Sequence, residues 1–176
     1  MSIYTYFPKI NYKIDEYDSL RAIDITSAIK IKDYLKSYRG ILFTPYIVKN
    51  GDRPDTVSNK LYGDPNYDWI ILIANDMYSV YADWPRNSVD LDAFIIEKYG
   101  SLSSAMSTVK YYYNSNLDII DETTYNSLAS TARRTETQYE YELRVNSNKS
   151  KIKVVKRNLI TAITSELNTI AKRPVL

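Results

Sequence analysis

The chain lacks the residues on which most enzyme and metal chemistry depends. Its 176 residues include no cysteine, no histidine and only 4 glycines. Without cysteine there is no disulfide and no thiolate nucleophile, and without histidine the commonest general base and zinc ligand are missing. So few glycines leave no room for a glycine-rich phosphate-binding loop. We therefore expect no cofactor, no metal and no catalytic residue, and a function that is not enzymatic.

Long apolar runs and a strong charge imbalance are also absent. No run approaches the roughly 18 apolar residues of a membrane-spanning helix, so no membrane span is expected. A formal net charge of +2 favours no nucleic-acid partner. The first residues, MSIYTYFPKI, lack the basic start and apolar core of a signal peptide, so we expect synthesis in the cytoplasm.

Carboxylates are the catalytic groups that remain. The pairs Asp15-Glu16 and Asp121-Glu122, and the group Asp83, Asp90 and Asp92, could be imagined as the acid and base of a glycoside hydrolase. However, Asp90 and Asp92 fall in the first turn of an expected helix, where they complement the helix dipole. A cell-wall hydrolase is therefore the weakest of the functions considered.

Tyrosine is the residue that the chain has in excess. There are 18 tyrosines against 3 phenylalanines and 2 tryptophans. Tyrosine combines a large apolar face with a polar tip and is favoured at protein interfaces. A low-GC coding bias, which enriches Tyr, Asn, Ile and Lys together, would give the same excess, and both explanations stay open.

A strand followed by a helix is predicted at residues 46–63. The β-forming side chains end at the turn signal Asn50-Gly51. Asp52 is expected to be the N-cap of the helix and Pro54 to lie in its first turn. Gly63 suits the left-handed position that ends a helix.

A second helix is predicted to begin near Asn66, and Asn75-Asp76 marks the start of its exit. Its buried stripe consists of Trp69, Ile70, Ile73 and Met77. We expect Trp69 to belong to the core. Trp84-Pro85 is an extended dipeptide, and its tryptophan either covers the core or anchors a partner.

These elements and their flanks resemble one protein family, the baseplate wedge protein of contractile-tailed bacteriophages that carries a lysin-motif (LysM)-like domain. The resemblance covers residues 4–100 best. The matching motifs, in order, are Tyr6-Phe7-Pro8-Lys9-Ile10, Asp24-Ile25, Gly51-Asp52-Arg53-Pro54, Leu61-Tyr62-Gly63-Asp64, Tyr67-Asp68-Trp69, Asn75-Asp76, Asp83-Trp84-Pro85 and Lys98-Tyr99-Gly100.

The resemblance implies a structural protein of the virion. It would link neighbouring wedge subunits in the tail baseplate, in an assembly of six wedges. The implied partners are the other wedge proteins and the small sheath-initiator-like wedge protein. The implied location is the tail baseplate, and no cofactor is implied.

A peptidoglycan-binding LysM module is the alternative. In LysM domains the sugar lies beside the loops that follow the first strand and the second helix. The present sequence departs from the LysM pattern after Asn75, where the usual return strand is not evident. We therefore expect a LysM-like core that serves as a scaffold.

The predicted fold is α+β, with a LysM-like strand–helix–helix core, an extended N-terminal arm, extra strands and a long C-terminal amphipathic helix. The predicted parts are an arm with a short helix (1–40), the core with a third helix capped by Ser88 (41–100), and strands with a C-terminal helix (101–176). Alternating side chains predict a strand at residues 136–146, and apolar residues at threes and fours predict a helix from Lys151 to Lys172.

Partner contacts are expected on the arm, on the tyrosine-rich strands and on the basic segment from Arg144 to Arg157. That basic segment is either a solvated face or a patch that faces an acidic protein. The candidate interface residues are Tyr4, Tyr12, Tyr139, Tyr141, Lys151, Lys153, Lys156 and Arg157.

Overall fold

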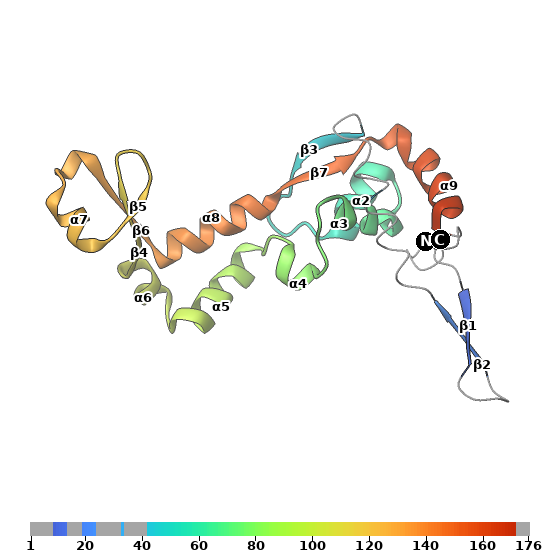
Figure 1. Cartoon of the computed structure of the whole chain (residues 1–176), viewed down its shortest axis with the longest axis horizontal. Helices are drawn as coiled ribbons and strands as arrows, with labels where there is room; N and C mark the ends of the chain where they lie inside the picture. The colour runs from blue at the N-terminus through green and yellow to red at the C-terminus, as the bar shows by residue number, and fades with distance from the viewer. Residues whose placement is uncertain (1–8, 14–18, 24–32, 34–41, 172–176) are drawn as a thin grey trace. The chain divides into compact units, whose positions relative to one another are not determined.

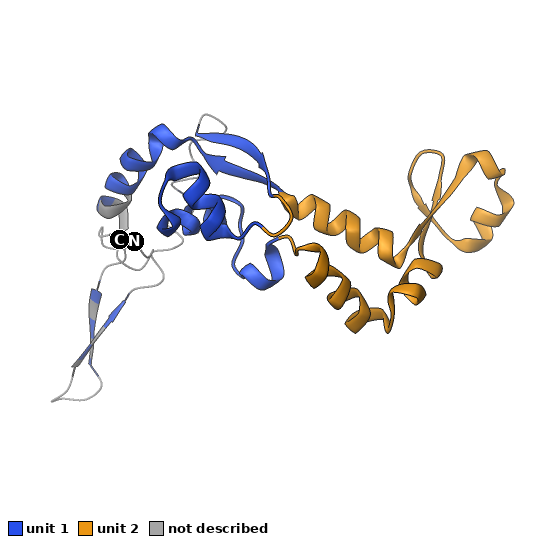
Figure 2. Cartoon of the chain, turned by 180° about the vertical axis from the view of Figure 1, so that it is seen from behind, with its two compact units in different colours: residues 1–48, 52–84, 151–176 blue, residues 49–51, 85–150 orange. Residues whose placement is uncertain are grey.

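The computed structural model describes residues 9–13, 19–23, 33 and 42–171 (Figure 1). The chain forms two compact units (Figure 2): residues 1–48, 52–84 and 151–176 make unit 1, and residues 49–51 and 85–150 make unit 2. This division differs from the expected one, because the third helix belongs to unit 2 and residues 151–176 return to unit 1. In chain order, unit 2 is therefore an insertion into unit 1.

Unit 1 mixes short strands with helices. Two antiparallel pairs are present among its described residues, β1 with β2 and β3 with β7. Its elements are β1 (Lys9–Lys13), β2 (Ser19–Ile23), β3 (Phe43–Ile47), α2 (Pro54–Tyr62), the 3-10 helix η2 (Pro65–Tyr67), α3 (Asp68–Ala74), α4 (Val80–Asp83), β7 (Lys151–Val155), the 3-10 helix η4 (Arg157–Leu159) and α9 (Ile160–Ala171).

The pairing partner of β3 is a strand much later in the chain, β7. No strand follows Asn75 directly, but β7 pairs antiparallel with β3 after the insertion, with Tyr46 opposite Ile152. The absence of a strand directly after Asn75 agrees with the sequence. The expected helix from Lys151 is wrong in its first part, because those residues form β7 and the helix α9 begins at Ile160. Ile152 and Val155 are three residues apart, a spacing that also suits a helix. In the strand, exposed lysines alternate with the buried Ile152 and Val154.

The ends of α2 follow the sequence signals in part. Pro54 lies in the first turn, and Gly63 ends the helix with φ 81°, as expected. Asp52 was expected to be the N-cap but does not hold that position. Arg53 holds that position, and its backbone N–H donates to the Thr56 hydroxyl at 2.8 Å.

The core of unit 1 is aliphatic with two tryptophans. Val57 of α2 and Ile70 and Ile71 of α3 are fully buried, while Trp69 and Trp84 are each 5% exposed. The buried side chains of β7 and of α9 join the same cluster. The strand β7 therefore completes this core in addition to pairing with β3.

Unit 2 combines helices with a small antiparallel sheet of strand order β5-β4-β6. Its elements are α5 (Ser88–Tyr99), α6 (Leu102–Ser107), β4 (Val109–Asn114), β5 (Ile119–Ile120), α7 (Glu122–Ser127), the 3-10 helix η3 (Ser130–Ala132), β6 (Arg133–Thr137) and α8 (Gln138–Ser150). The cap of α5 is Asn87 and not the expected Ser88.

The strand predicted at residues 136–146 is wrong, because α8 occupies most of that range. The helix buries Glu142 instead of an apolar stripe, so its sequence shows no helical hydrophobic period. A capping box was the available signal: the Thr137 backbone N–H donates to Glu140 at 2.8 Å, and the Glu140 N–H donates to the Thr137 hydroxyl at 3.2 Å. No described helix is long and apolar enough to cross a membrane.

Candidate protein-docking surfaces

The outer edge of β7 is covered by one side chain. The Asn75 amide accepts a hydrogen bond from the Lys153 N–H at 2.7 Å and donates to the Lys153 carbonyl at 2.7 Å. It also donates to the Ile71 carbonyl at 2.7 Å. Asn75 thus occupies the backbone groups that an added strand would use, and it ties the end of α3 to β7.

The outer edge of β3 is blocked by a proline. Pro45 stands opposite Lys153, and the Lys156 N–H donates to the Leu42 carbonyl at 2.8 Å. Because hydrogen-bonded pairs alternate in an antiparallel ladder, this bond places Pro45 where its nitrogen points away from β7. A proline there removes a donor from the free edge. Neither edge of this sheet is therefore well suited to strand addition at these positions.

One face of the β3–β7 sheet is exposed and carries lysines. Lys151 and Lys153 are exposed, and they stand opposite Ile47 and Pro45 of β3. The Ile47 side chain is 68% exposed. We call these four residues the lysine face.

The segment after α3, from the turn at Tyr78 to the first residues of α4, exposes aromatic side chains. Tyr78 is 79% exposed and Tyr81 is 91% exposed, with Val80 between them at 42%. The Asp83 carboxylate accepts hydrogen bonds from the Tyr78 and Ser79 N–H groups at 2.8 and 2.9 Å, which fixes the turn into α4. We call Tyr78, Val80 and Tyr81 the tyrosine loop.

Trp84 is a core residue and not an exposed anchor. Its ring is buried, and its indole N–H donates to the Asp52 carbonyl at 2.8 Å. The Asp52 carboxylate in turn accepts from the Lys60 ammonium group. Two matching motifs, Gly51-Asp52 and Trp84-Pro85, therefore meet through this bond.

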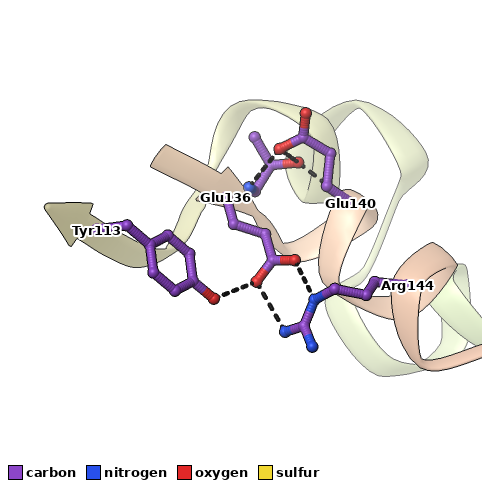
Figure 3. Close-up of polar contacts among 5 residues, drawn as sticks. Tyr113, Glu136, Glu140 and Arg144 are labelled. Carbon is purple, nitrogen blue, oxygen red and sulfur yellow. Dashed lines mark hydrogen bonds and ion pairs between the residues drawn. The ribbon is translucent and has the colours of Figure 1, made fainter. Parts of the chain in front are cut away.

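In unit 2 a buried carboxylate holds the sheet to α8 (Figure 3). The Glu136 carboxylate accepts from the Arg144 guanidinium at 2.6 and 3.0 Å and from the Tyr113 hydroxyl at 2.8 Å. The hydrogen bonds from Arg144 lower the pKa of Glu136 and raise that of Arg144. Charge-assisted, two-point bonds of this kind fix geometry as well as charge.

A second buried carboxylate joins α8 to α5. Glu142 accepts from the Lys98 ammonium group at 2.8 Å and from the Tyr99 hydroxyl at 2.7 Å. Burial alone would raise the pKa of Glu142, but the bonds from Lys98 and Tyr99 outweigh it and the pKa is lowered. The inward face of α8 is therefore polar and paired.

Tyrosines line both faces of the unit 2 sheet. Tyr111 packs edge-on against Tyr113 and Tyr141, with ring centroids 6.3 and 5.6 Å apart. On the other face, Tyr112 packs on Tyr125 at 4.8 Å, and the Arg133 guanidinium lies 4.7 Å from the Tyr125 ring. In the part of the chain that the structure describes, no cluster of three acidic residues could hold a metal ion.

Comparison with known proteins assigns the family. The family model described as base plate wedge protein 53 matches residues 2–126. The chain belongs to this family. Baseplate wedge protein gp53 of Enterobacteria phage T4 is 27% identical over 117 residues, which cover 65% of the chain and 59% of that relative.

Family membership confirms the expectation of a phage baseplate wedge protein in the tail of the virion. The matched residues include most of unit 1 before the insertion and more than half of unit 2. They end before α8 and β7. The LysM-like character of unit 1 stays a prediction.

The structure describes only some of the expected site residues. Tyr4, Tyr6, Phe7 and Pro8 lie outside the described residues, as does the Tyr12 side chain. Of the described motif residues, Pro54, Tyr62, Trp69 and Trp84 are buried in unit 1, and burial raises the pKa of the Tyr62 hydroxyl to about 12. Asp52, Asn75 and Pro85 are partly exposed, and Gly51 and Gly63 are exposed.

The expected interface residues that the structure describes are divided between the two units. Tyr139 packs on the small apolar cluster of α5 and α6, and Tyr141 packs on Tyr111. Lys151 and Lys153 belong to the lysine face, and Lys156 and Arg157 are exposed after β7. The tyrosine loop was not predicted, and the only sequence signal for it was two tyrosines in a segment without helical or strand periodicity.

Proposed function

We propose that the chain is a structural part of a contractile-tail baseplate wedge that links neighbouring wedge subunits in a six-wedge assembly. The observation that carries this proposal is the family match over residues 2–126. The proposed partners are other wedge proteins, including the sheath-initiator-like one.

Two exposed surfaces support a docking role. The lysine face combines positive charge with the exposed Ile47, a composition that suits an acidic protein surface. The tyrosine loop exposes large apolar side chains, which are enriched at the centres of protein interfaces.

Photo-crosslinking during phage assembly tests the linking role. A photoreactive amino acid at Lys153 or Tyr81 should give covalent products with other baseplate proteins. The same substitution at Asn59, on the exposed side of α2, should give few. The linking role is contradicted if mature baseplates contain the chain and neither Lys153 nor Tyr81 gives a product with another wedge protein.

Peptidoglycan binding is the second candidate. It is supported by the β3–α2–α3–β7 order of unit 1, which is that of a LysM-like core, and by the exposed Tyr78 and Tyr81 in the loop after the second helix. Sedimentation with purified peptidoglycan tests it. Retention that is lost in a Tyr78→Ala/Tyr81→Ala variant would favour this function, and no retention would exclude it.

A further inference from the structure

A small pocket lies beside the paired Glu136 carboxylate of unit 2. The cavity has a volume of about 250 Å³ and is lined by Tyr113, Leu117, Arg134, Glu136 and Arg144. The strand register puts Ile119, Tyr113 and Arg134 in one row across the sheet, because directly opposite residues share a face. The pocket therefore has a cationic side and an apolar side.

The charges of this pocket do not cancel. Both oxygens of Glu136 are engaged by Arg144 and Tyr113. Arg134 is exposed, and its guanidinium forms no ion pair or hydrogen bond with any described residue, although its charge also lowers the pKa of Glu136. One guanidinium of the pocket thus remains available to an external anion.

The apolar side is held in an unfavourable conformation. Leu117 is 65% exposed and has φ 67°, a left-handed value that is unfavourable for a residue other than glycine. The turn is fixed by the Asn114 side chain, which accepts from the Asn116 and Asp118 N–H groups at 2.9 Å each. Glycine would suit this position better for folding, so the exposed leucine is unexplained by the stability of the turn.

We propose that this pocket docks an acidic segment of a partner protein. A carboxylate of that segment pairs with Arg134, and a neighbouring apolar side chain packs against Leu117 and Ile119, which is 62% exposed. Charge and polarity are both complementary to such a segment, because a guanidinium without a side-chain partner lies beside exposed aliphatic groups. The identity of the partner as another baseplate protein rests on the proposed function, whereas the docking chemistry does not.

Titration of the labelled full chain with a probe peptide tests the docking chemistry. The probe is an acetylated, amidated peptide that alternates leucine with aspartate, and its control replaces each aspartate by asparagine. The acidic peptide should shift the amide signals of Tyr113, Leu117 and Arg134, and the control should not. Equal shifts by the two peptides, shifts centred elsewhere, or no saturable shift would overturn the proposal.

Variants separate docking from folding. Arg134→Glu should weaken binding of the acidic peptide by about tenfold or more, the change expected for losing one charge-assisted contact. Leu117→Gly should weaken binding while raising the midpoint of thermal unfolding, an opposite pair of effects that a purely structural role would not give. Arg53→Glu, an exposed arginine in unit 1, should leave binding unchanged. Unchanged affinity in Arg134→Glu would contradict the proposal.

Phage assembly distinguishes the two proposals. If baseplates contain the wild-type chain and contain Arg134→Glu equally well, the wedge function stands and the pocket is not its docking site. If purified baseplates lack the wild-type chain, the wedge function is contradicted. The peptide titration then remains the test of whether the pocket binds an acidic segment.

Discussion

The two units of this chain are stabilised in different ways. Unit 1 has an aliphatic core in which Val57, Ile70 and Ile71 are fully buried. Unit 2 has a small apolar cluster of Leu91, Ile95 and Ala105, and its sheet and α8 are held by tyrosines and by paired carboxylates. Apolar burial is indifferent to pH, whereas paired carboxylates stabilise only while they are ionised.

This difference explains how unit 1 can accommodate the insertion of unit 2 within its chain. The long insertion, residues 85–150, begins after α4 and ends at β7, so unit 1 completes its core with residues that follow unit 2 in the chain. Unit 2 supplies its own contacts, and its polar interior is paired within unit 2. The two interiors therefore impose separate requirements on the sequence.

The largest expected effect is in the unit 1 core. Ile70→Ala should lower the free energy of unfolding by about 2–5 kcal/mol, because it deletes fully buried methyl groups and leaves a cavity. Both tryptophans of the chain, Trp69 and Trp84, belong to unit 1, so tryptophan fluorescence in urea reports the change. Ile47→Ala, at an exposed position, should cost less than about 0.5 kcal/mol. Equal costs at the two positions would contradict the assigned core.

A smaller effect is expected where α3 meets β7. Asn75→Ala removes the amide that bonds both backbone groups of Lys153 and should cost about 1–2 kcal/mol. The freed edge of β7 should also increase self-association, measured by light scattering. Asn59→Ala, at an exposed position of α2, is the matched control and should change neither quantity appreciably.

The smallest of the three substitution effects is expected in unit 2. Glu136→Gln weakens the bonds to Arg144 and Tyr113 and should cost about 1 kcal/mol, since Arg144 is half exposed and can rehydrate. Hydrogen exchange should show lower amide protection in β4, β6 and α8 and unchanged protection in β3 and β7. Glu97→Gln, an exposed glutamate on α5, should have no comparable effect. A loss of protection centred in unit 1 would break the distinction between the units.

The sequence predicted local features well and distant pairings poorly. Pro54 and Gly63 mark the ends of α2 because cap and turn chemistry is local. The identity of α8 was missed because its buried Glu142 is acceptable only next to Lys98 and Tyr99, far earlier in the chain. The strand β7 was missed because its partner β3 lies on the other side of the insertion.

The candidate surfaces were predicted only in part. Lys151 and Lys153 were named from their charge, and the structure adds that they share a face with Ile47. Arg134 and Leu117 were not identified, because neither residue lies in a sequence motif. Their common pocket depends on the register of three strands and on the φ value of Leu117.

Hydrogen exchange of the intact chain at two pH values tests the contrast between the units most directly. The folded-state pKa values of Glu136 and Glu142 lie below their ordinary value of 4.5, so their stabilisation is present above that pH and is lost as the pH falls through the folded values. After correction for intrinsic exchange rates, acidification from neutral pH to below 4.5 should deprotect β4, β6 and α8 before β3 and β7. Simultaneous loss of amide protection in both units, or earlier loss in β3 and β7, would contradict the proposed difference between the units.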